Sequence, residues 1–569
     1  VFAVSYTATW TASQHDQAAY QVGADIRMDP GRRAGSPPNW AIDRLLADTP
    51  GVMVWTPVSR DPISLARASR SAEVLGIDAL TAAEVVAFRT DIADVSLQRL
   101  IAPLVAGRPQ VNFIPLPFGP GERHLLRVTA DVEATELTTE GEPGDPNLVR
   151  GWPGLSVAVV LRDATGALFR FTGESGPLGR ENDLVVQIGT AGADSRAAFA
   201  YPLELVAIEL SVDTPPGTVV SGGSVALRGV SAQIDGVWTP VPLHLDGGWR
   251  ARASYFRGFQ QPVDLSDDAD GLVASVGGAS LPALLPLDAA GRGMVMTLAP
   301  EILTAVTSGT VPLLLTDAGL DATGHGAGDD FTMRIAEGNR NVAIVGVVRG
   351  FPGTAAGQPV VIADLPTLAL LQFERAGTVG EAEEWWLRVD GGQGASVALG
   401  LAQPPLLADA VMETDERASA LSRDPVALGI IGALTIGSVA AALFAAIGFV
   451  ISMAVSVRER LTEFALLRAL GLSESQLMAW LALESAVLAL ISLAAGTAIG
   501  LAMAWVALPS ITVTQDAKAP FPPVEVHIPW GSIAVLEFVG LAVLGLTLLA
   551  VTRLMRSSGI AARLRIGED

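Results

Sequence analysis

Three long apolar runs lie near the end of the chain and divide it into a membrane part and a part with shorter hydrophobic patterns. The runs cover residues 425–457, 475–508 and 528–554, and the first of them contains no charged residue. About 20 consecutive apolar residues are enough for a helix to cross a bilayer. Each run therefore predicts a transmembrane helix. Residues 1–12 begin with an apolar stretch and lack an initiator Met, so we interpret them as the end of a truncated fourth span, with a processed N-terminus as the alternative.

The residues before the first long run carry the patterns of a large folded domain. Hydrophobic positions in 13–105 and in 290–424 mix helical and strand periods. Between them, residues 106–245 alternate apolar and polar positions in short runs separated by Gly, Pro and Asp, which is typical of an antiparallel β-sandwich. A Gly/Pro/Asp-rich stretch at 246–289 reads as a linker. The strands predicted for the sandwich are 125–132, 155–162, 167–172, 184–188, 203–212 and 224–233.

The predicted fold class follows from these patterns. It is a membrane α-helical bundle of three spans plus the stub of a fourth, with a large α+β domain into which an antiparallel, jelly-roll-like β-sandwich is inserted. Trp385 and Trp386 stand next to each other in a predicted strand, where successive side chains point to opposite faces. We expect at least one of the two indoles in the core, while the other could meet a partner or the membrane surface.

The basic residues predict which ends of the spans face the cytoplasm. The loop 458–474 holds three Arg and the tail 555–569 holds another three, whereas the connector 509–527 holds only Lys518. Lys and Arg in short loops mark the cytoplasmic side. The loop and the tail are therefore predicted inside, and the connector and the large domain outside. We expect a multi-pass protein of the bacterial plasma membrane with an extracytoplasmic domain.

Composition excludes several classes of function. The net charge of -22 argues against nucleic-acid binding, and the absence of Cys excludes disulfide and thiol chemistry. Lys518 is the only lysine and follows Ala517, so the chain has no phosphate-binding loop and no ATP site of its own. The strong preference for Arg over Lys suggests a GC-rich bacterial source, such as an actinobacterium.

Metal and enzyme chemistry are not expected either. The five His residues lie far apart with no His-x-x-x-His pair, and no nucleophile elbow occurs. We therefore predict no metal, no catalytic residues and no cofactor in this chain. The acidic run 264–271 fails as a calcium loop because Gly277 stands where a bidentate Glu is needed. We interpret it as a solvated turn, with an irregular cation site as the alternative.

The loop between the first two spans is the most informative segment. Residues 458–474 are charged and helix-forming, yet an apolar run flanks them on each side. A short amphipathic helix between two membrane spans could transmit force from a cytoplasmic partner to the spans. The alternative interpretation is a plain connecting loop. Gly471 is expected to end this helix, and Ser473 to cap the next one.

The amino-acid sequence of this loop also contains a specific motif. Residues 463–473 read EFALLRALGLS, and weaker motifs occur earlier in the expected order: GADIR at 23–27, TPGV at 49–52, VPLLL at 311–315 and GVVRGFP at 346–352. With these residues the chain resembles the FtsX/MacB/LolC-type permeases of ABC systems, with a MacB-like core domain and FtsX-like spans. The resemblance covers 1–100 and 290–569, and the sandwich departs from the compact form of the domain.

The resemblance implies that several chains share the function of the assembly. ATP and Mg²⁺ would be bound by a separate cytoplasmic ABC ATPase dimer, whose motion would pass through the loop to the extracytoplasmic domain, a mechanism described as mechanotransmission. A second permease subunit or an N-terminal half, membrane lipids and an unknown extracytoplasmic partner would complete the assembly. The residues expected to couple to the ATPase are Arg458, Leu461, Glu463, Phe464, Leu467, Arg468, Gly471 and Ser473.

Four residues inside the apolar runs are candidates for contacts between spans. A carboxylate is costly to place in hydrocarbon, so Glu484 and Glu537 are candidates for a functional role. Since both lie near helix ends, we favour anchoring at the interface or helix–helix hydrogen bonding over a proton or substrate role. Gly496 and Gly500 form a small-xxx-small pair that allows helices to approach closely.

Two other functions remain open from the sequence. A true exporter would move a lipid or drug along the spans, although these consist mostly of Ala, Leu, Gly and Ile. A membrane-anchored receptor would bind glycan through the sandwich, and its spans would serve only as an anchor. The leading expectation is mechanotransmission to an outer domain that handles a lipid, a lipoprotein or another envelope partner.

Overall fold

The structure is a computed structural model and falls into two compact units. One comprises residues 1–19 and 415–569, and the other residues 20–414. The structure describes residues 1–31, 36–65, 71–120, 124–139, 154–191, 195–196, 198–213, 218–244, 248–255, 259–268, 271–276, 292–423, 425–460, 463, 466–467, 470–511 and 520–557.

A nine-stranded mixed sheet forms the first part of the unit 20–414. Its strand order is β19-β20-β18-β21-β3-β2-β22-β1-β23, so strands from before and after the β-rich insert alternate within one sheet. The β18/β20 and β21/β3 pairs are parallel and the others antiparallel. The strands are β1 (Ile26–Asp29), β2 (Val52–Ile63), β3 (Ala72–Ile77), β18 (Val311–Thr316), β19 (Asp330–Ile335), β20 (Gly338–Val348), β21 (Val360–Asp364), β22 (Glu384–Val389) and β23 (Ala410–Glu413).

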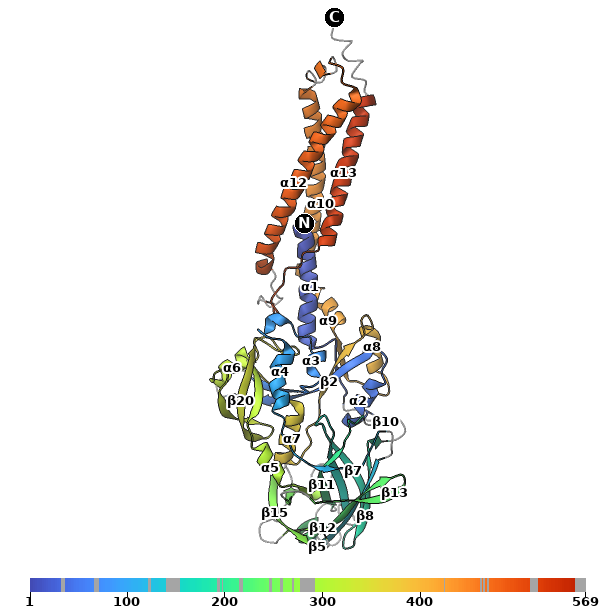
Figure 1. The fold of residues 1–569 in the computed structure, drawn as a ribbon, viewed down its shortest axis with the longest axis vertical. Coiled ribbons are helices and arrows are strands. Elements are labelled where there is room, and N and C mark those ends of the chain that lie inside the picture. The colour runs from blue at the N-terminus through green and yellow to red at the C-terminus, as the bar shows by residue number, and fades with distance from the viewer. Residues whose placement is uncertain are drawn as a thin grey trace. The chain divides into compact units, whose positions relative to one another are not determined.

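Helices cover both faces of this sheet (Figure 1). Leu97, Leu100 and Leu104 of α4 pack with Trp386 in one apolar cluster. The opposite face carries Trp385, which packs with residues of α2 and α8. The helices of this unit are α2 (Asn39–Ala47), α3 (Ala82–Val85), α4 (Leu97–Ala106), α5 (Ile302–Thr307), α6 (Asp317–Thr323), α7 (Leu365–Ala376) and α8 (Gly394–Leu401), with a 3-10 turn at Thr90–Ile92. The next helix, α9 (Thr414–Leu421), belongs to the other unit from residue 415 on.

Both indoles of the tryptophan pair lie in the core, so the second is not exposed to a partner or to the membrane surface. Trp385 and Trp386 are 2% and 0% exposed. Alternation along the strand does send them to opposite faces, but β22 lies inside a sheet that is covered on both sides. Each indole also has a carboxylate acceptor: Trp385 Nε1 donates to the half-buried Asp43 at 2.8 Å, and Trp386 Nε1 donates to the buried Glu384 at 3.0 Å.

The second part of the unit is an all-antiparallel β domain, which lies beside the mixed sheet (Figure 1). Twelve strands join in the order β7-β6-β11-β17-β14-β15-β16-β12-β5-β8, with β13 beside β12 and β4 beside β11. One apolar cluster runs through it from Ile114 to Leu298. The strands are β4 (Ile114–Pro115), β5 (His124–Thr139), β6 (Gly154–Arg162), β7 (Leu168–Pro177), β8 (Asn182–Ile188), β11 (Glu204–Asp213), β12 (Thr218–Ile234), β13 (Val237–Val241), β14 (Trp249–Tyr255), β15 (Phe259–Asp268), β16 (Gly271–Val276) and β17 (Arg292–Pro300); β9 (Thr190–Ala191) and β10 (Ser195–Arg196) pair separately.

Every strand predicted for this insert overlaps an observed strand, but the predicted boundary at 245 is wrong. The supposed linker 246–289 contains β14, β15 and β16, and β17 follows it. The inward positions of β14 and β16 are largely alanines, such as Ala251, Ala253 and Ala274. Alanine carries little hydrophobic signal, so the alternation is weak in the sequence although the strands pair fully with their neighbours.

The acidic run also lies differently from the prediction. Residues 264–268 belong to β15, and Asp268 pairs with Gly271 of β16. The run is therefore mostly strand rather than turn; residues 269–270 lie outside the described part. Among the described residues, no group of three His, Cys, Asp or Glu side chains is placed to hold a metal ion.

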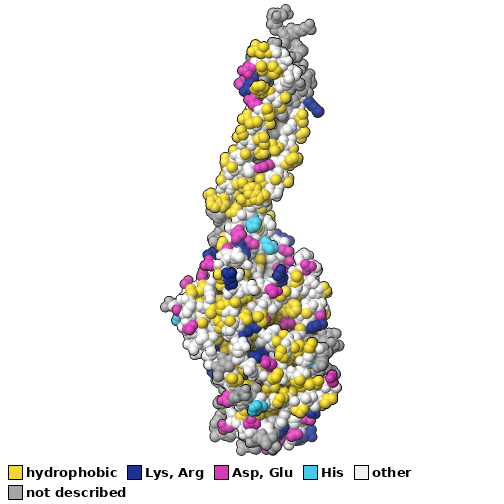
Figure 2. All heavy atoms as spheres, in the orientation of Figure 1, with side chains coloured by type: hydrophobic (Ala, Val, Ile, Leu, Met, Phe, Trp, Pro, Cys, Tyr) yellow, Lys and Arg dark blue, Asp and Glu magenta, His cyan; other side chains and the backbone are white. Residues whose placement is uncertain are grey.

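Long helices dominate the other unit. They are α1 (Phe2–Val22, whose residues 20–22 belong to the unit 20–414), α10 (Pro425–Glu459), α12 (Glu474–Ile511) and α13 (Trp530–Ser557). Within the described residues, Leu428–Ser452 and Ala482–Leu508 are long and apolar enough to span a membrane, and α13 contributes the shorter apolar stretch Trp530–Val543. Large apolar side chains such as Phe444, Trp505 and Phe538 are more than 70% exposed there. Figure 2 shows hydrophobic side chains along these helices.

The predicted helix end near residue 12 is wrong, because α1 continues to Val22. Polar residues interrupt the apolar pattern after Thr7 without ending the helix. Thr11 Oγ1 donates to the Thr7 carbonyl at 2.9 Å, and Gln17 Nε2 donates to Ser13 Oγ at 3.0 Å. Tyr6 and Trp10 pack in one cluster with Ala504 and Leu508 of α12. The length of an apolar run therefore underestimates this helix.

Candidate functional site: the loop between α10 and α12

The described part of the loop holds a helical turn that ends at a glycine. Leu470 N–H donates to the Leu466 carbonyl at 3.1 Å, and Leu472 N–H donates to the Leu467 carbonyl at 3.2 Å. Gly471 has a φ of 101°. A glycine with positive φ followed by a bond that reaches back five residues is the Schellman ending of a helix. Gly471 therefore reverses the chain between two helices.

Ser473 and Gln476 begin α12 with reciprocal hydrogen bonds. Gln476 N–H donates to Ser473 Oγ at 3.4 Å, and Ser473 N–H donates to Gln476 Oε1 at 2.9 Å. This is a capping box, which satisfies two amide groups that the first helical turn leaves without partners. The connection between Gly471 and α12 is consequently short and geometrically defined.

The structure describes only some of the other predicted coupling residues. Arg458 belongs to α10, which continues to Glu459, and Glu463 and Leu467 are helical. Leu466 and Leu470 are 66% and 74% exposed, and they lie one helical turn apart. Leu466 was not among the residues predicted to couple to the ATPase, although it lies one helical turn before Leu470. Leu461, Phe464 and Arg468 lie outside the described residues.

An ion pair joins the start of the loop to α12. Arg460 Nη1 lies 2.8 Å from Glu484 Oε2, and both side chains are about two-fifths exposed. Arg460 was not predicted as a partner, since it is one of several Arg residues in the loop. The contact joins Glu484 of α12 to the loop rather than to another helix, and the anchoring or helix–helix role predicted for Glu484 stays a prediction.

Glu537 makes a hydrogen bond between two helices. Thr497 Oγ1 of α12 donates to Glu537 Oε1 of α13 at 2.5 Å. The two glycines beside Thr497 behave differently: a Cβ added to Gly500 would lie 2.9 Å from Val1 of α1, whereas one added to Gly496 would have nothing within 4 Å among the described residues. Gly500 alone thus permits a close approach, and the pair does not act as one packing surface in the described structure.

A comparison with known protein families gives one match, and it lies in this region. Residues 435–560 match the FtsX-like permease C-terminal family. The match begins inside α10, includes the whole loop and α12, and ends just beyond α13. A search of curated proteins gave no match for the chain.

The FtsX-like region has direct consequences for the rest of the chain. Together with the two candidate spans it indicates a membrane protein of the ABC permease type. Such domains are non-catalytic transporter components, and FtsX-like permeases work with cytoplasmic ABC ATPases. The match does not extend to residues 1–434, so the MacB-like character of the large domain remains a prediction.

Candidate functional site: the junction of the mixed sheet and the β domain

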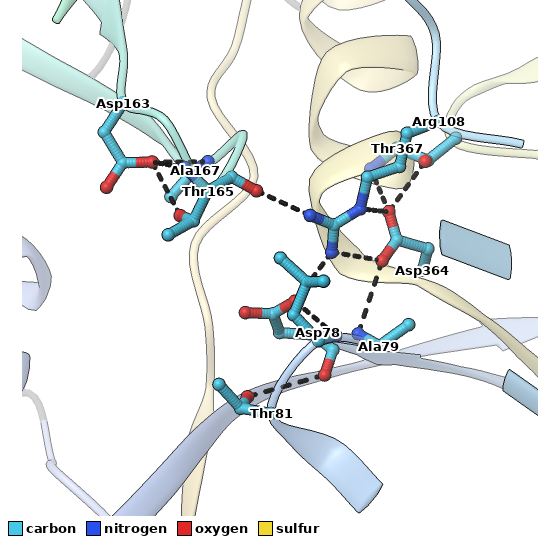
Figure 3. A network of polar contacts seen from close by, with 10 residues as sticks. Asp78, Ala79, Thr81, Arg108, Asp163, Thr165, Ala167, Asp364 and Thr367 are labelled. Atoms are coloured by element: carbon cyan, nitrogen blue, oxygen red, sulfur yellow. Dashed lines mark hydrogen bonds and ion pairs between the residues drawn. The ribbon is translucent and has the colours of Figure 1, made fainter. Parts of the chain in front are cut away.

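An arginine and two aspartates of the mixed-sheet part meet a turn of the β domain (Figure 3). Arg108 Nη2 lies 2.7 Å from Asp364 Oδ1 and 2.6 Å from Asp78 Oδ1, and Arg108 Nε donates to Asp364 Oδ2 at 3.0 Å. Arg108 Nη1 donates to the Thr165 carbonyl at 2.6 Å. The turn that carries Thr165 is held by Asp163, whose Oδ1 accepts from Thr165 N–H at 2.9 Å. The guanidinium therefore links the two parts of the unit.

A second charged cluster crosses the same junction. Glu374 of α7 lies 2.9 Å from Arg340 Nη2 and 3.1 Å from Arg252 Nη2, and Arg250 Nη1 lies 3.4 Å away. Arg250 and Arg252 belong to β14 of the β domain, whereas Arg340 belongs to β20. Burial alone would raise the pKa of Glu374. The hydrogen bond from Arg340 and the three positive charges outweigh this effect and hold the pKa below its usual 4.5.

Neither cluster was found from the sequence. Arg108 and Asp364 are 256 positions apart, and Arg250 and Glu374 are 124 apart. A single charged residue in a polar loop or on a helix has no local pattern that identifies its partner. Only the tertiary fold brings Arg108 to Asp364 and the arginines of β14 to Glu374 of α7.

Replacing Glu374 by Gln is expected to destabilise the unit by about 2–3 kcal/mol, because three partly buried arginines would lose their counter-charge. A carboxylate whose folded pKa is lowered stabilises the protein above its unfolded pKa and loses this contribution as pH falls through the folded pKa. The difference in thermal midpoint between the wild type and E374Q should therefore be complete above about pH 4.5 and shrink below it. Thermal unfolding of the full-length protein in detergent across this pH range measures it.

The control is Glu84→Gln, which neutralises an exposed glutamate on α3. We expect no difference from the wild type at any pH, since exposed charges contribute little to stability. A midpoint of E374Q equal to that of the wild type at neutral pH would show that the arginine cluster does not hold the two parts together.

Proposed function

We propose that the chain is the permease subunit of an ABC system in which a separate cytoplasmic ATPase dimer drives movement of the extracytoplasmic domain. The observation that carries this proposal is the FtsX-like match over residues 435–560. It contains a loop in which a helical turn, a left-handed glycine and a capped helix follow one another between two apolar helices. Such a connection is rigid enough to pass a displacement from a bound partner to α12.

The proposal includes the membrane topology. α13 serves as a third span, the loop 458–474 and the tail face the cytoplasm, and residues 20–414 lie outside. The asymmetry of Arg and Lys between loop and connector supports this orientation. ATP and Mg²⁺ are held by the partner ATPase rather than by this chain, and a second permease subunit or N-terminal half completes the bundle among membrane lipids.

The proposed output is mechanotransmission rather than transport through the spans. The described faces of α10 and α12 are apolar, and the spanning stretches have a mean hydropathy of 2.3 and 2.2. This composition suits lipid and helix contacts better than a polar path for a solute. The extracytoplasmic partner would be a lipid, a lipoprotein or another envelope component.

The test is co-purification of the full-length protein from its membrane, with and without Leu470→Asp. A carboxylate at this exposed apolar position should weaken a hydrophobic contact with the ATPase and reduce its recovery about tenfold or more. The matched control is Val237→Asp, which changes an equally exposed apolar side chain of β13 and should leave recovery unchanged. Absence of any ATPase from the wild-type preparation would refute the ABC assembly, whereas equal recovery with L470D would refute the contact at the loop.

A further inference from the structure

A cavity at the junction within residues 20–414 combines aromatic walls with carboxylates. It has a volume of about 160 Å³ and lies between α2, β7 and the start of α7. Its walls include the rings of Trp40, Phe169 and Trp385, and the carboxylates of Asp43, Asp78 and Glu381 border it. A water molecule takes up about 30 Å³ of liquid, so the space holds roughly five waters or one small organic molecule.

Asp43 is held in a fixed orientation by two indoles. Trp55 Nε1 and Trp385 Nε1 donate to the same oxygen, Asp43 Oδ1, at 2.9 and 2.8 Å. The other oxygen, Oδ2, accepts no hydrogen bond from a described residue. Burial raises the pKa of Asp43, and the two indole hydrogen bonds only partly oppose this. The charged form of this carboxylate thus lacks a counter-charge of its own among the described side chains.

The basic side chains near the cavity are already paired. Arg170, the one basic residue in its described lining, donates to Glu209 Oε2 at 2.8 Å. Arg108, which is not part of the lining, forms ion pairs with Asp78 of the lining and with Asp364. Once these pairs are formed, Asp43 and Glu381 remain as the negative charges without a basic partner in the described structure. Glu381 lies at the exposed rim and accepts from Asn39 Nδ2 at 3.2 Å.

From this geometry we infer that the cavity binds a small organic cation, with its charge next to Asp43 and its alkyl groups against Trp40, Phe169 and Trp385. Aromatic faces attract ammonium groups through the negative charge density of their rings, and a carboxylate at the base of an aromatic cage adds a direct ion pair. The helix α2 supplies both elements, because Trp40 and Asp43 are three residues apart and so lie on one face.

The chemistry that is recognised is an alkylammonium group. It can come from a free molecule such as a choline-like cation or from the lysine side chain of a peptide. The inference does not depend on the proposed permease function, since it concerns residues 20–414 alone and is tested by binding rather than by coupling to an ATPase.

Isothermal titration of the full-length protein in nanodiscs tests the inference. Choline and N-acetyl-lysine amide are titrated as the two sources, and 3,3-dimethyl-1-butanol serves as the neutral isostere of choline. We expect saturable binding of choline, of the lysine amide or of both at one site, and no comparable binding of the alcohol. Failure of both cations to bind at millimolar concentration, or binding of the alcohol as tight as that of choline, would overturn the inference.

Asp43→Asn separates the charge from the packing. The asparagine carbonyl still accepts from both indoles, so the variant should unfold at the wild-type temperature or above while its affinity for the cation falls about tenfold or more. Asp48→Asn on the same helix, which changes a carboxylate outside the cavity lining, should bind as the wild type does. A folded D43N protein with unchanged affinity would overturn the assignment.

Discussion

Replacing Gly471 by Pro is expected to uncouple the ATPase from the permease and to lower permease-dependent ATP hydrolysis about tenfold or more. Proline fixes φ near −65°, whereas Gly471 has a φ of 101°. The chain therefore cannot reverse at this position, and the bond from Leu472 N–H to the Leu467 carbonyl is lost. The helical turn and the capped start of α12 would no longer hold a defined angle. The measurement is ATP hydrolysis by the complex reconstituted in nanodiscs.

The control for this variant is Gly471→Asn. Asparagine tolerates positive φ better than other residues with a side chain, so we expect it to keep most of the coupling. Far-UV circular dichroism should show that both variants retain the long helices. Wild-type ATP hydrolysis by a complex that contains G471P would contradict the role of this turn in transmission.

Replacing Arg108 by Met is expected to destabilise the unit 20–414 by about 3–5 kcal/mol. The guanidinium is 12% exposed, and its partner Asp364 is 2% exposed. Removing the cation leaves Asp364 and Asp78 with uncompensated charge in a buried place, and the link to the Thr165 carbonyl of the β domain disappears. Asp364 also caps α7 through Thr367 N–H at 3.1 Å, so the change affects a helix start as well. The thermal unfolding midpoint of the full-length protein reports the loss.

Two further variants sharpen this expectation. Arg108→Lys keeps the charge but cannot form the bidentate contact with Asp364, so its midpoint should lie between those of the wild type and R108M. Arg44→Met removes an exposed arginine whose partner on the same helix is Asp48, and we expect a change below about 1 kcal/mol. If R108M and R44M lowered the midpoint equally, the buried network would not be what joins the two parts.

Local patterns predicted the parts of the fold that short-range physics decides. Apolar length located α10, α12 and α13 to within a few residues, and period-two alternation located strands such as β6 and β11. The serine–glutamine spacing at 473–476 places a capping box where α12 begins. Each of these features depends on residues only a few positions apart, so its energy can be read from the order of residues alone.

Other features were missed because their cause is distant in the chain. The alanine-rich strand β14 has little hydrophobic signal and is stabilised by pairing with β15 and β17. The contact of Gly500 with Val1 likewise joins the two ends of the chain. The length of α1 is an exception, because the bonds that its polar side chains make lie within the helix, four residues apart, and the length of an apolar run does not show them.

By itself, the sequence determined that this chain has apolar helices able to span a membrane, a charged loop between them with an FtsX-like motif, and a strand-rich insert. These three features depend only on composition and on the spacing of nearby residues. Only the tertiary structure decided which charges meet. Asp43 faces its two indoles, Arg108 joins Asp364 to the β domain, and Glu374 gathers three arginines. Long-range pairing of strands sets these contacts, and an ionic or hydrogen-bonded pair leaves no trace in the residues next to either partner.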